Sequence, residues 1–390
     1  MSSSDQPLRP CLLHVGMPKT GTSSIQEYLF HQLRDPDFLY LGFGEVNAAR
    51  ALATLCLQRP EQFWAFRWNG DSGDRLARLA GRYRRKLQRG LSQARRQQRL
   101  PILSAEVCWA FHQDAHERLR DLLAAEGFQA RVLVYLRPYL SQLESSFQQN
   151  IKWSTNCSSL TLDPEFMHQG VHHEVKYDYV SRLQVLEAVY GFPNLTVRLF
   201  RRDALQAGCA VQDFCAQTGI RVVGRPVNRA NDALSLDALR ILYAYRKYAH
   251  QPGRSSIREH TALLHHLQEL GGGKLRLHPV VVESIADQLA GQDSAILERH
   301  GIDLRAQSGD PQTDSRGIRE EADLFRFSQR SLDWLAAAAD CQPLHGEGEA
   351  LARQVAAAVD RLRRRVVRIH WRYLLRQRIR RERGRWRHRI

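Results

Sequence analysis

A turn rich in glycine and hydroxyl side chains, residues 18–24 (PKTGTSS), is the segment of the chain best suited to bind an anion. It follows an apolar run at 11–17 and precedes residues 25–33, whose apolar positions recur with helical spacing, so the pattern predicts a strand, a turn and a helix. The free N–H groups and the dipole at such a helix start attract phosphate. Lys19 adds a mobile cation, and Gly21 lets the backbone approach a ligand closely. The hydroxyl donors are Thr20, Thr22, Ser23 and Ser24.

The turn departs from the usual nucleotide-binding P-loop. That motif, GxxxxGK followed by Ser or Thr, needs a lysine directly after its second glycine. Gly16 and Gly21 have the required separation, but Thr22 stands at the lysine position and Lys19 precedes Gly21. This disfavours a standard ATPase or GTPase. A turn of this composition with no ligand remains an alternative, because such turns are frequent between strands and helices.

A second candidate anion site follows the strand expected at 130–137. Arg137 ends that strand, and in a parallel sheet the carboxyl ends of the strands face the ligand crevice. A guanidinium there can bind phosphate through two parallel hydrogen bonds. Ser145 lies eight residues later, within a helix expected at 141–153, so strand and helix must converge for both side chains to reach one phosphate. Taken alone, Arg137 is equally compatible with an ordinary surface arginine.

Both segments resemble motifs of one enzyme family. Residues 13–29 (LHVGMPKTGTSSIQEYL) resemble the 5′-phosphosulfate motif of sulfotransferases that use 3′-phosphoadenosine 5′-phosphosulfate (PAPS), especially the bacterial and carbohydrate-type members. Residues 144–149 (ESSFQQ) are similar to the 3′-phosphate motif of that family, with Phe147 where tyrosine is usual. Residues 200–220 resemble a further recurrent stretch. The resemblance covers roughly residues 10–220 and is loose in the C-terminal third.

The resemblance implies a P-loop-like three-layer α/β fold with PAPS as the donor co-substrate. By the same resemblance, Lys19 and the backbone of residues 20–24 hold the 5′ sulfo-phosphate, while Arg137 and Ser145 hold the 3′-phosphate. Sulfuryl transfer builds charge on the bridging oxygen of the leaving phosphate, and a cation placed there stabilises the transition state. Lys19 is our candidate for that role. Fixed donors of this kind need no metal ion.

The acceptor hydroxyl must lose a proton, so the site requires a base. Our candidate is Glu106, at the end of the strand expected at 102–106, where it would face the same sheet edge as Arg137. A glutamate that only caps the following helix is the structural alternative. Competing bases are Glu45, after the expected second strand, and His172 or His173.

Histidine and cysteine spacing gives little support for a metal centre. His168, His172 and His173 lie close in sequence, but a third ligand and a helical frame are not evident, so we expect no metal. His260, His265 and His266 are expected on a helix surface. The seven cysteines are scattered and form no CxxC pair, which is typical of a reducing compartment.

Five expected strands alternate with helices, which predicts a parallel sheet covered on both faces. The strands are expected at 11–17, 38–44, 102–106, 130–137 and 194–200. Helices are expected at 75–99 and 211–218, and mostly helical structure from about residue 229. We expect one α/β domain over 1–345, with a basic helical insertion at about 59–100, and a basic amphipathic helical tail over 346–390.

The net charge of +16 is concentrated in two segments. Residues 361–390 carry +13 and residues 75–99 carry +10, so the remainder is −7. This pattern disfavours a histone-like role and favours local contact with phosphates, sulfates or anionic lipid. For the tail we considered an anionic membrane surface first, then a partner helix, then a plain solvated tail, and nucleic acid last. The basic helix at 75–99 would attract an anionic glycan or simply be solvated.

The predicted function is therefore sulfuryl transfer from PAPS to a hydroxyl, less readily an amine, of a saccharide or glycolipid. The chain has no apolar run of about 18 residues and no secretory signal pattern. We therefore expect a cytoplasmic protein, with peripheral attachment to the inner face of the plasma membrane as an option. Two competing functions are a nucleotide or small-molecule kinase and a non-catalytic protein that binds membrane or nucleic acid through its arginine-rich tail.

Overall fold

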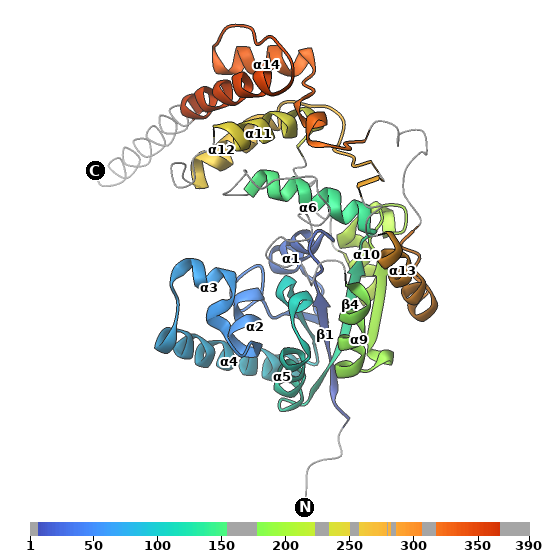
Figure 1. Ribbon diagram of the computed structural model, residues 1–390. Coiled ribbons are helices and arrows are strands. Elements are labelled where there is room, and N and C mark those ends of the chain that lie inside the picture. Colours follow the sequence, from blue (N-terminus) through green and yellow to red (C-terminus); the bar gives the residue numbers. More distant parts are fainter. Residues whose placement is uncertain are drawn as a thin grey trace, which may run out of the picture. The chain divides into compact units, whose positions relative to one another are not determined.

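The structure is a computed structural model, which describes residues 7–153, 178–222, 234–249, 257–278, 280–281, 286–305 and 317–366. His168, His172, His173 and the tail from residue 367 lie outside these ranges. The chain divides into two compact units (Figure 1). The first comprises Met1–Gln142, Val171–Ala230 and Ala286–Gly309, and the second comprises Leu143–Gly170, Asn231–Ile285 and Asp310–Ile390.

The first unit is built on a five-stranded sheet in which every neighbouring pair of strands is parallel. Its order is β2-β3-β1-β4-β5. The strands are β1 (Arg9–Val15), β2 (Phe38–Tyr40), β3 (Leu100–Ala105), β4 (Phe128–Leu136) and β5 (Leu195–Leu199). In the register of the sheet, Leu13 lies between Leu103 of β3 and Val132 of β4. The predicted α/β class with a central parallel sheet is confirmed, as is the position of each predicted strand.

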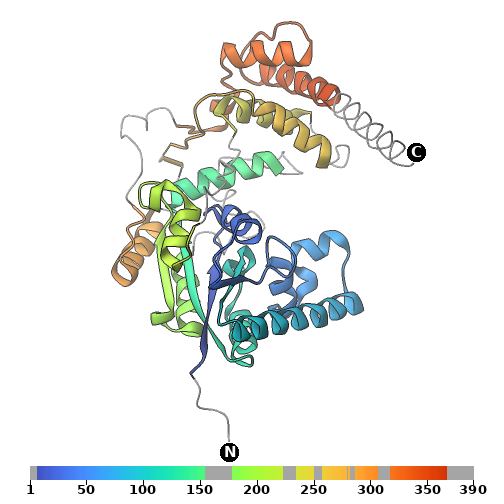
Figure 2. The same cartoon turned by 180° about the vertical axis from the view of Figure 1, so that it is seen from behind.

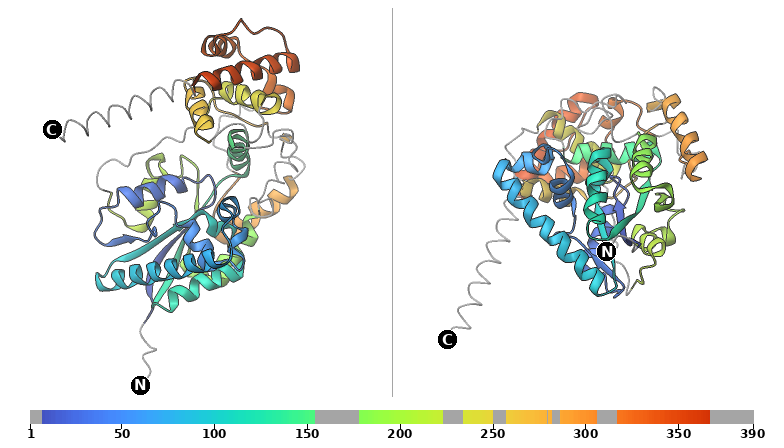
Figure 3. Two further views of the ribbon diagram at one scale, coloured as in Figure 1. Left: turned by 90° about the vertical axis from the view of Figure 1, so that its left-hand side faces the viewer. Right: turned by 90° about the horizontal axis from the view of Figure 1, so that it is seen from below.

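The central strands are apolar along nearly their whole length because both of their faces are buried. In β1, every residue from Cys11 to Val15 is buried, and β4 is buried continuously from Val132 to Leu136. Such continuous apolar runs are typical of parallel strands that have helices on both sides. Figure 3 shows helices on both sides of this sheet.

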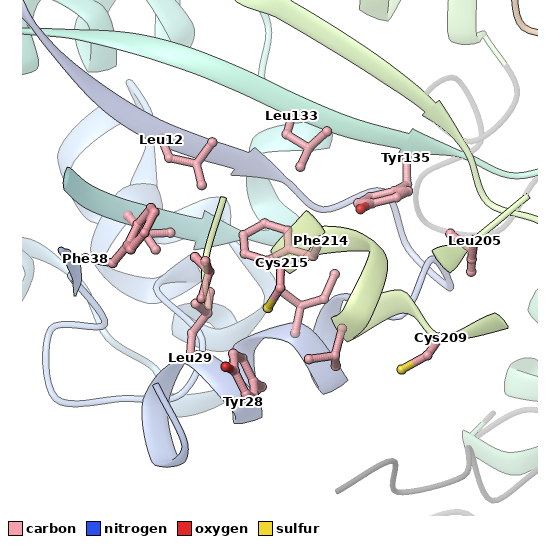
Figure 4. Close-up of a cluster of buried hydrophobic side chains, with 14 residues drawn as sticks. Leu12, Tyr28, Leu29, Phe38, Leu133, Tyr135, Leu205, Cys209, Phe214 and Cys215 are labelled. Atoms are coloured by element: carbon pink, nitrogen blue, oxygen red, sulfur yellow. The ribbon is translucent and has the colours of Figure 1, made fainter. Parts of the chain in front are cut away.

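One face of the sheet is covered by α1 (Thr22–His31) and α10 (Ala210–Thr218). The two helices meet the strands in a buried cluster that contains Leu12, Tyr28, Leu133 and Phe214 (Figure 4). A buried carboxylate on α10, Asp213, fixes this helix to the sheet. It accepts hydrogen bonds from the Tyr135 hydroxyl, the Arg198 guanidinium and the Gln206 N–H, at 2.8, 2.8 and 3.0 Å.

Further helices of the first unit pack on β3 and β4 (Figure 2). Strand β4 contacts α5 (Gln113–Ala124) and α9 (Tyr179–Tyr190), whereas β3 contacts α2 (Ala49–Cys56) and α4 (Gly73–Arg96). The remaining elements are α3 (Trp64–Asn69), α13 (Ala286–His300) and the short 3₁₀ helices η1 (Pro60–Gln62), η2 (Glu106–Ala110), η3 (Phe192–Asn194) and η4 (Gln206–Gly208).

The second unit is helical wherever the structure assigns it regular secondary structure, apart from an isolated bridge between Leu277 and Ile318. It contains most of α6 (Tyr139–Trp153), then α11 (Leu236–Tyr248), α12 (Ile257–Leu267), η7 (Glu321–Phe325), α14 (Gln329–Ala339) and a helix over 348–366. The buried Arg246 of α11 donates to the carbonyls of Ile151 and Lys152, at 3.2 and 2.5 Å, and so satisfies the C-terminal end of α6.

Candidate functional site

The order of the sheet brings three strand ends of the first unit together. Strand β1 lies between β3 and β4, so the chain leaves β1 toward one side of the sheet and later returns to its other side. In open parallel sheets, ligands bind at this reversal of strand order, beyond the carboxyl ends of the strands. The residues that follow β1, β3 and β4 are the turn at 16–21, Glu106 and Arg137. These are the segments from which the sequence predicts a donor site.

The turn after β1 is fixed by its own hydrogen bonds. The Gly16 N–H donates to the Ala105 carbonyl at 3.2 Å, which ties the turn to the end of β3. The Thr20 and Thr22 hydroxyls both donate to the Met17 carbonyl, at 2.7 and 3.3 Å, and both side chains are buried. Their hydroxyl hydrogens therefore shape the turn, and what these two residues present to a ligand is their backbone.

Two residues of the turn have left-handed backbone conformations. Gly21 has φ 73° and directly precedes α1, where a Cβ atom would lie only 2.6 Å from the Cβ of Ala210. Lys19 has φ 67°, which is uncommon for a residue other than glycine and is concentrated at functional sites. No side chain of the described residues caps α1, so the N–H groups of its first turn remain suited to an anion. Ser23 is exposed and Ser24 is half-buried in that turn.

Arg137 connects the two predicted anion-binding segments directly. Its Nη1 donates to the Lys19 carbonyl at 2.8 Å, and its Nε donates to the Ser141 hydroxyl at 2.8 Å. The Tyr179 hydroxyl donates to the Arg137 carbonyl at 3.0 Å, and the guanidinium carbon lies 5.9 Å from the centre of the Phe200 ring. The guanidinium is thus held in place at the turn.

Ser141, and not Ser145, makes the hydrogen bond that orients this guanidinium. Ser145 is half-buried on α6, one helical turn after Ser141, and it belongs to the second unit. Ser141 was not among the residues predicted from the sequence. The contact could have been inferred from the position of Ser141, four residues after Arg137 and near the start of a helix.

Glu106 follows β3 directly and begins η2. Burial raises the pKa of its carboxyl, and the positive charge of Lys19 opposes that rise. The two side chains are therefore electrostatically coupled. A carboxylate whose pKa is raised is a stronger base than an exposed one, which suits the role of general base.

The competing base Glu45 is engaged in a different contact. It accepts a hydrogen bond from the Tyr83 hydroxyl at 3.4 Å, and an Arg50 nitrogen lies 4.0 Å from its carboxylate. These contacts connect the loop after β2 to α4 and α2. His172 and His173, the remaining candidate bases, lie outside the described residues.

A buried polar cluster behind the turn was missed in the sequence analysis. The His14 Nδ1 lies 2.8 Å from the Ser104 hydroxyl, and the Gln26 amide donates to the Ser104 hydroxyl and carbonyl, both at 3.3 Å. Burial lowers the pKa of His14 to about 3, so its imidazole is neutral at physiological pH. The cluster joins β1, α1 and β3, so it links the two elements on either side of the Lys19 turn to the strand that ends just before Glu106. The sequence contains one indication of this cluster: His14 and Ser104 are polar residues within two otherwise apolar strands.

Among the described residues, no group of three or more His, Cys, Asp or Glu side chains is arranged to hold a metal ion. Within the same ranges, no helix is both long enough and apolar enough to cross a bilayer.

Comparisons with known proteins give one structural similarity. No family model matches the chain, and no curated protein matches its sequence. Among solved structures, the chain is similar to the crystal structure of a sulfotransferase from Alicyclobacillus acidocaldarius, with a TM-score of 0.43 and 16% sequence identity. That match covers 76% of this chain and 98% of the other.

Proposed function

We propose that this chain is a sulfotransferase that transfers a sulfuryl group from PAPS to an acceptor hydroxyl. In this proposal Lys19 and the backbone of residues 20–24, including Gly21, hold the 5′ end of the donor. Arg137, oriented by Ser141, holds the 3′-phosphate. Glu106 is the general base.

The observation that carries the proposal is the hydrogen bond from Arg137 to the Lys19 carbonyl. It places a fixed guanidinium next to the turn that carries Lys19, beside a helix start that has no side-chain cap. A donor with phosphate at both its 5′ and 3′ positions needs two such anion sites at a fixed separation. A nucleoside triphosphate does not need the second site.

The residues of this edge fit the chemistry of sulfuryl transfer. When the acceptor oxygen attacks sulfur, an S–O bond forms and the S–O bond to the leaving phosphate breaks. Glu106 accepts the proton of the acceptor hydroxyl, and Lys19 neutralises the charge that develops on the bridging oxygen. The products are a sulfate ester and 3′,5′-bisphosphoadenosine. The charge is balanced by Lys19, Arg137 and the helix N–H groups, so the proposal assigns no role to a metal ion.

Calorimetric binding of 3′,5′-bisphosphoadenosine tests the donor site, with 5′-AMP and Mg-ATP as competing ligands. We expect the bisphosphate to bind best, and Lys19→Ala and Arg137→Ala each to weaken it at least about tenfold, because each removes a charged contact with phosphate. Arg131→Ala is the matched control, since Arg131 is an exposed arginine on β4, the strand that ends just before Arg137, and should have no effect.

Different outcomes identify different functions. If the chain binds Mg-ATP better than the bisphosphate, its function is that of a nucleotide or small-molecule kinase and the sulfotransferase proposal fails. If removal of residues 361–390 abolishes the main activity and Lys19→Ala has no effect, the chain is better described as a non-catalytic protein that acts through its tail. A saccharide or glycolipid as acceptor, and an anionic membrane surface as partner of the tail, extend the proposal. They would be tested by acceptor screening and vesicle binding once the donor is established.

A further inference from the structure

Helix α4 presents a straight row of arginines to solvent. We define the arginine row as Arg78, Arg82, Arg85, Arg89 and Arg96, all of which are exposed. At 3.6 residues per turn, these five positions fall within about 60° of one another around the helix axis and extend over about 27 Å along it. The buried side of α4 (Leu76, Tyr83, Leu87 and Leu91) lies on the opposite side of the helix.

Three of the other basic residues of α4 are used by the fold, whereas the row is not; Arg84 is exposed on a different side of the helix. Arg75 pairs with the buried Asp71 at 2.8 Å, Lys86 donates to the Phe43 carbonyl, and Arg95 donates to the Glu126 carbonyl. These three contacts fasten α4 along its length. Within the described part of the chain, no member of the arginine row forms an ion pair or hydrogen bond with another residue.

An unpaired row of this kind costs stability. Arg78 and Arg82, Arg82 and Arg85, and Arg85 and Arg89 are spaced three or four residues apart, so each pair brings like charges together on one helix face. The only acidic residue of α4 is Asp74, in its first turn. The repulsion within the row is relieved when an anion with several charges lies along it.

We propose that the arginine row binds a linear anionic polysaccharide, such as a sulfated or carboxylated glycan. Arginine suits this ligand because its planar guanidinium forms paired hydrogen bonds with sulfate, carboxylate and phosphate groups. One line of cations matches a linear polymer of regularly spaced anions. The choice of a saccharide rests on the proposed function, whereas the binding of a polyanion does not.

Two features of α4 disfavour other polyanionic partners. Single-stranded nucleic acid is usually held by aromatic side chains on which bases stack, and the row contains none. Membrane-surface helices insert an apolar face into the lipid, but the apolar face of α4 is buried in its own unit. The exposed large apolar side chains of the described residues all lie outside this helix.

The side of α4 next to the row is held against the rest of the first unit. The loop after β2, at the carboxyl edge of the sheet, packs on the middle of α4 through Lys86 with Phe43 and through Tyr83 with Glu45. A Cβ atom at Gly90 would lie 2.7 Å from Leu41, so this loop and the helix are in close contact. These contacts hold α4 in place and leave the row facing solvent.

Arginine footprinting tests the proposal in the full chain, with size-defined dextran sulfate as the probe. Modification of arginines by phenylglyoxal is read residue by residue, so the signal of the row is separate from that of the tail. We expect dextran sulfate to protect all five members of the row, with Arg34 and Arg131 unprotected and with no protection by neutral dextran.

Two triple variants, each of which removes three positive charges, provide a stricter test. In Arg82→Gln/Arg85→Gln/Arg89→Gln, the remaining Arg78 and Arg96 report occupancy of the row. We expect about 100-fold weaker protection of these two, because each exposed arginine contributes roughly fivefold to binding an anionic surface. The control, Arg34→Gln/Arg59→Gln/Arg131→Gln, removes three exposed arginines outside α4 and should leave the affinity unchanged.

Three results would overturn the proposal: equal weakening in both triple variants, no protection of the row, or tighter binding of duplex DNA or phosphatidylserine vesicles to the row. The test is separate from that of the donor site, because the row variant should bind 3′,5′-bisphosphoadenosine as well as the wild type does. If bisphosphate binding fails while the footprint holds, the row still binds a polyanion, and the sulfotransferase assignment fails.

Discussion

A single methyl group added to the turn after β1 should affect both folding and donor binding. Gly21 has φ 73°, and a Cβ atom there would lie 2.6 Å from Ala210 and 3.3 Å from the Phe200 ring. Gly219, at the C-terminal end of α10, has nearly the same backbone (φ 77°) but nothing within 4 Å of its Cβ position. Gly21→Ala and Gly219→Ala therefore share the backbone cost and differ in packing.

The expected cost of each substitution follows from these distances. A left-handed conformation costs a residue with a Cβ atom roughly 1–2 kcal/mol, and this applies to both variants. Carbon atoms pack at about 3.5–4.0 Å, so Gly21→Ala must also relieve an overlap of about 1 Å. Overpacking of this kind costs about 1–3 kcal/mol, and Ala210 cannot simply move away because Asp213 fixes α10 to the sheet. We expect losses of about 2–5 kcal/mol for Gly21→Ala and about 1–2 kcal/mol for Gly219→Ala.

Urea denaturation measures the two losses, and calorimetry measures the affinity for 3′,5′-bisphosphoadenosine. Affinity should fall in Gly21→Ala, whose turn is displaced, and remain unchanged in Gly219→Ala. Adding Ala210→Gly to Gly21→Ala should restore the packing part of the loss, since it removes the overlapping methyl group. Equal losses in the two single variants would refute the packing argument. A destabilised Gly21→Ala that keeps its full affinity would show that the donor does not bind this turn.

Three further predictions concern the site and its support. Glu106→Gln should lower the turnover rate by about 10²–10⁴-fold. It should also abolish the acid limb of the pH–rate profile, because that limb reports protonation of the base, whose pKa burial raises. An unchanged profile would exclude Glu106 as the base. Ser141→Ala should weaken bisphosphate binding about tenfold through loss of the hydrogen bond that orients the guanidinium, and calorimetry of Ser145→Ala shows whether Ser145 contributes separately. Asp35→Asn should lower the urea midpoint above about pH 4, where the Asp35 carboxyl is ionised even in the unfolded chain, because the hydrogen bond from Arg221 lowers the pKa of Asp35 in the folded protein to about 2. The difference between variant and wild type should shrink as the pH falls toward 2. A difference that does not depend on pH would contradict this account.

The sheet and its carboxyl edge were predictable because apolar runs reveal buried strands and because parallel strands share one carboxyl edge. Lys19, Glu106 and Arg137 each follow such a run, so their place at that edge follows from the topology alone. The hydrogen bond between Arg137 and the Lys19 backbone confirms that two of these segments meet. The roles proposed for these residues remain predictions.

The sequence does not reveal which acceptor each hydrogen-bond donor uses in the folded protein. Thr20 and Thr22 are attractive ligand donors by type, yet their hydroxyls are used by the Met17 carbonyl, which only the folded turn brings within reach. The contact of Ser141 with Arg137 and the pairing of His14 with Ser104 likewise depend on side-chain direction. The division of the chain within α6 has no signal in composition or hydropathy, because the helix is continuous through it.

The central position of β1 also has a consequence for biosynthesis. This strand leaves the ribosome before both of its neighbours, β3 and β4, and Arg9 pairs with Phe128. At translation rates of about 5–20 residues per second, roughly 6–24 s pass before the second neighbour is made. During that interval an apolar strand has open edges, which are templates for aggregation. Nascent chains that stop before residue 128 should therefore depend on chaperones, and productive folding should begin only after β4 has emerged.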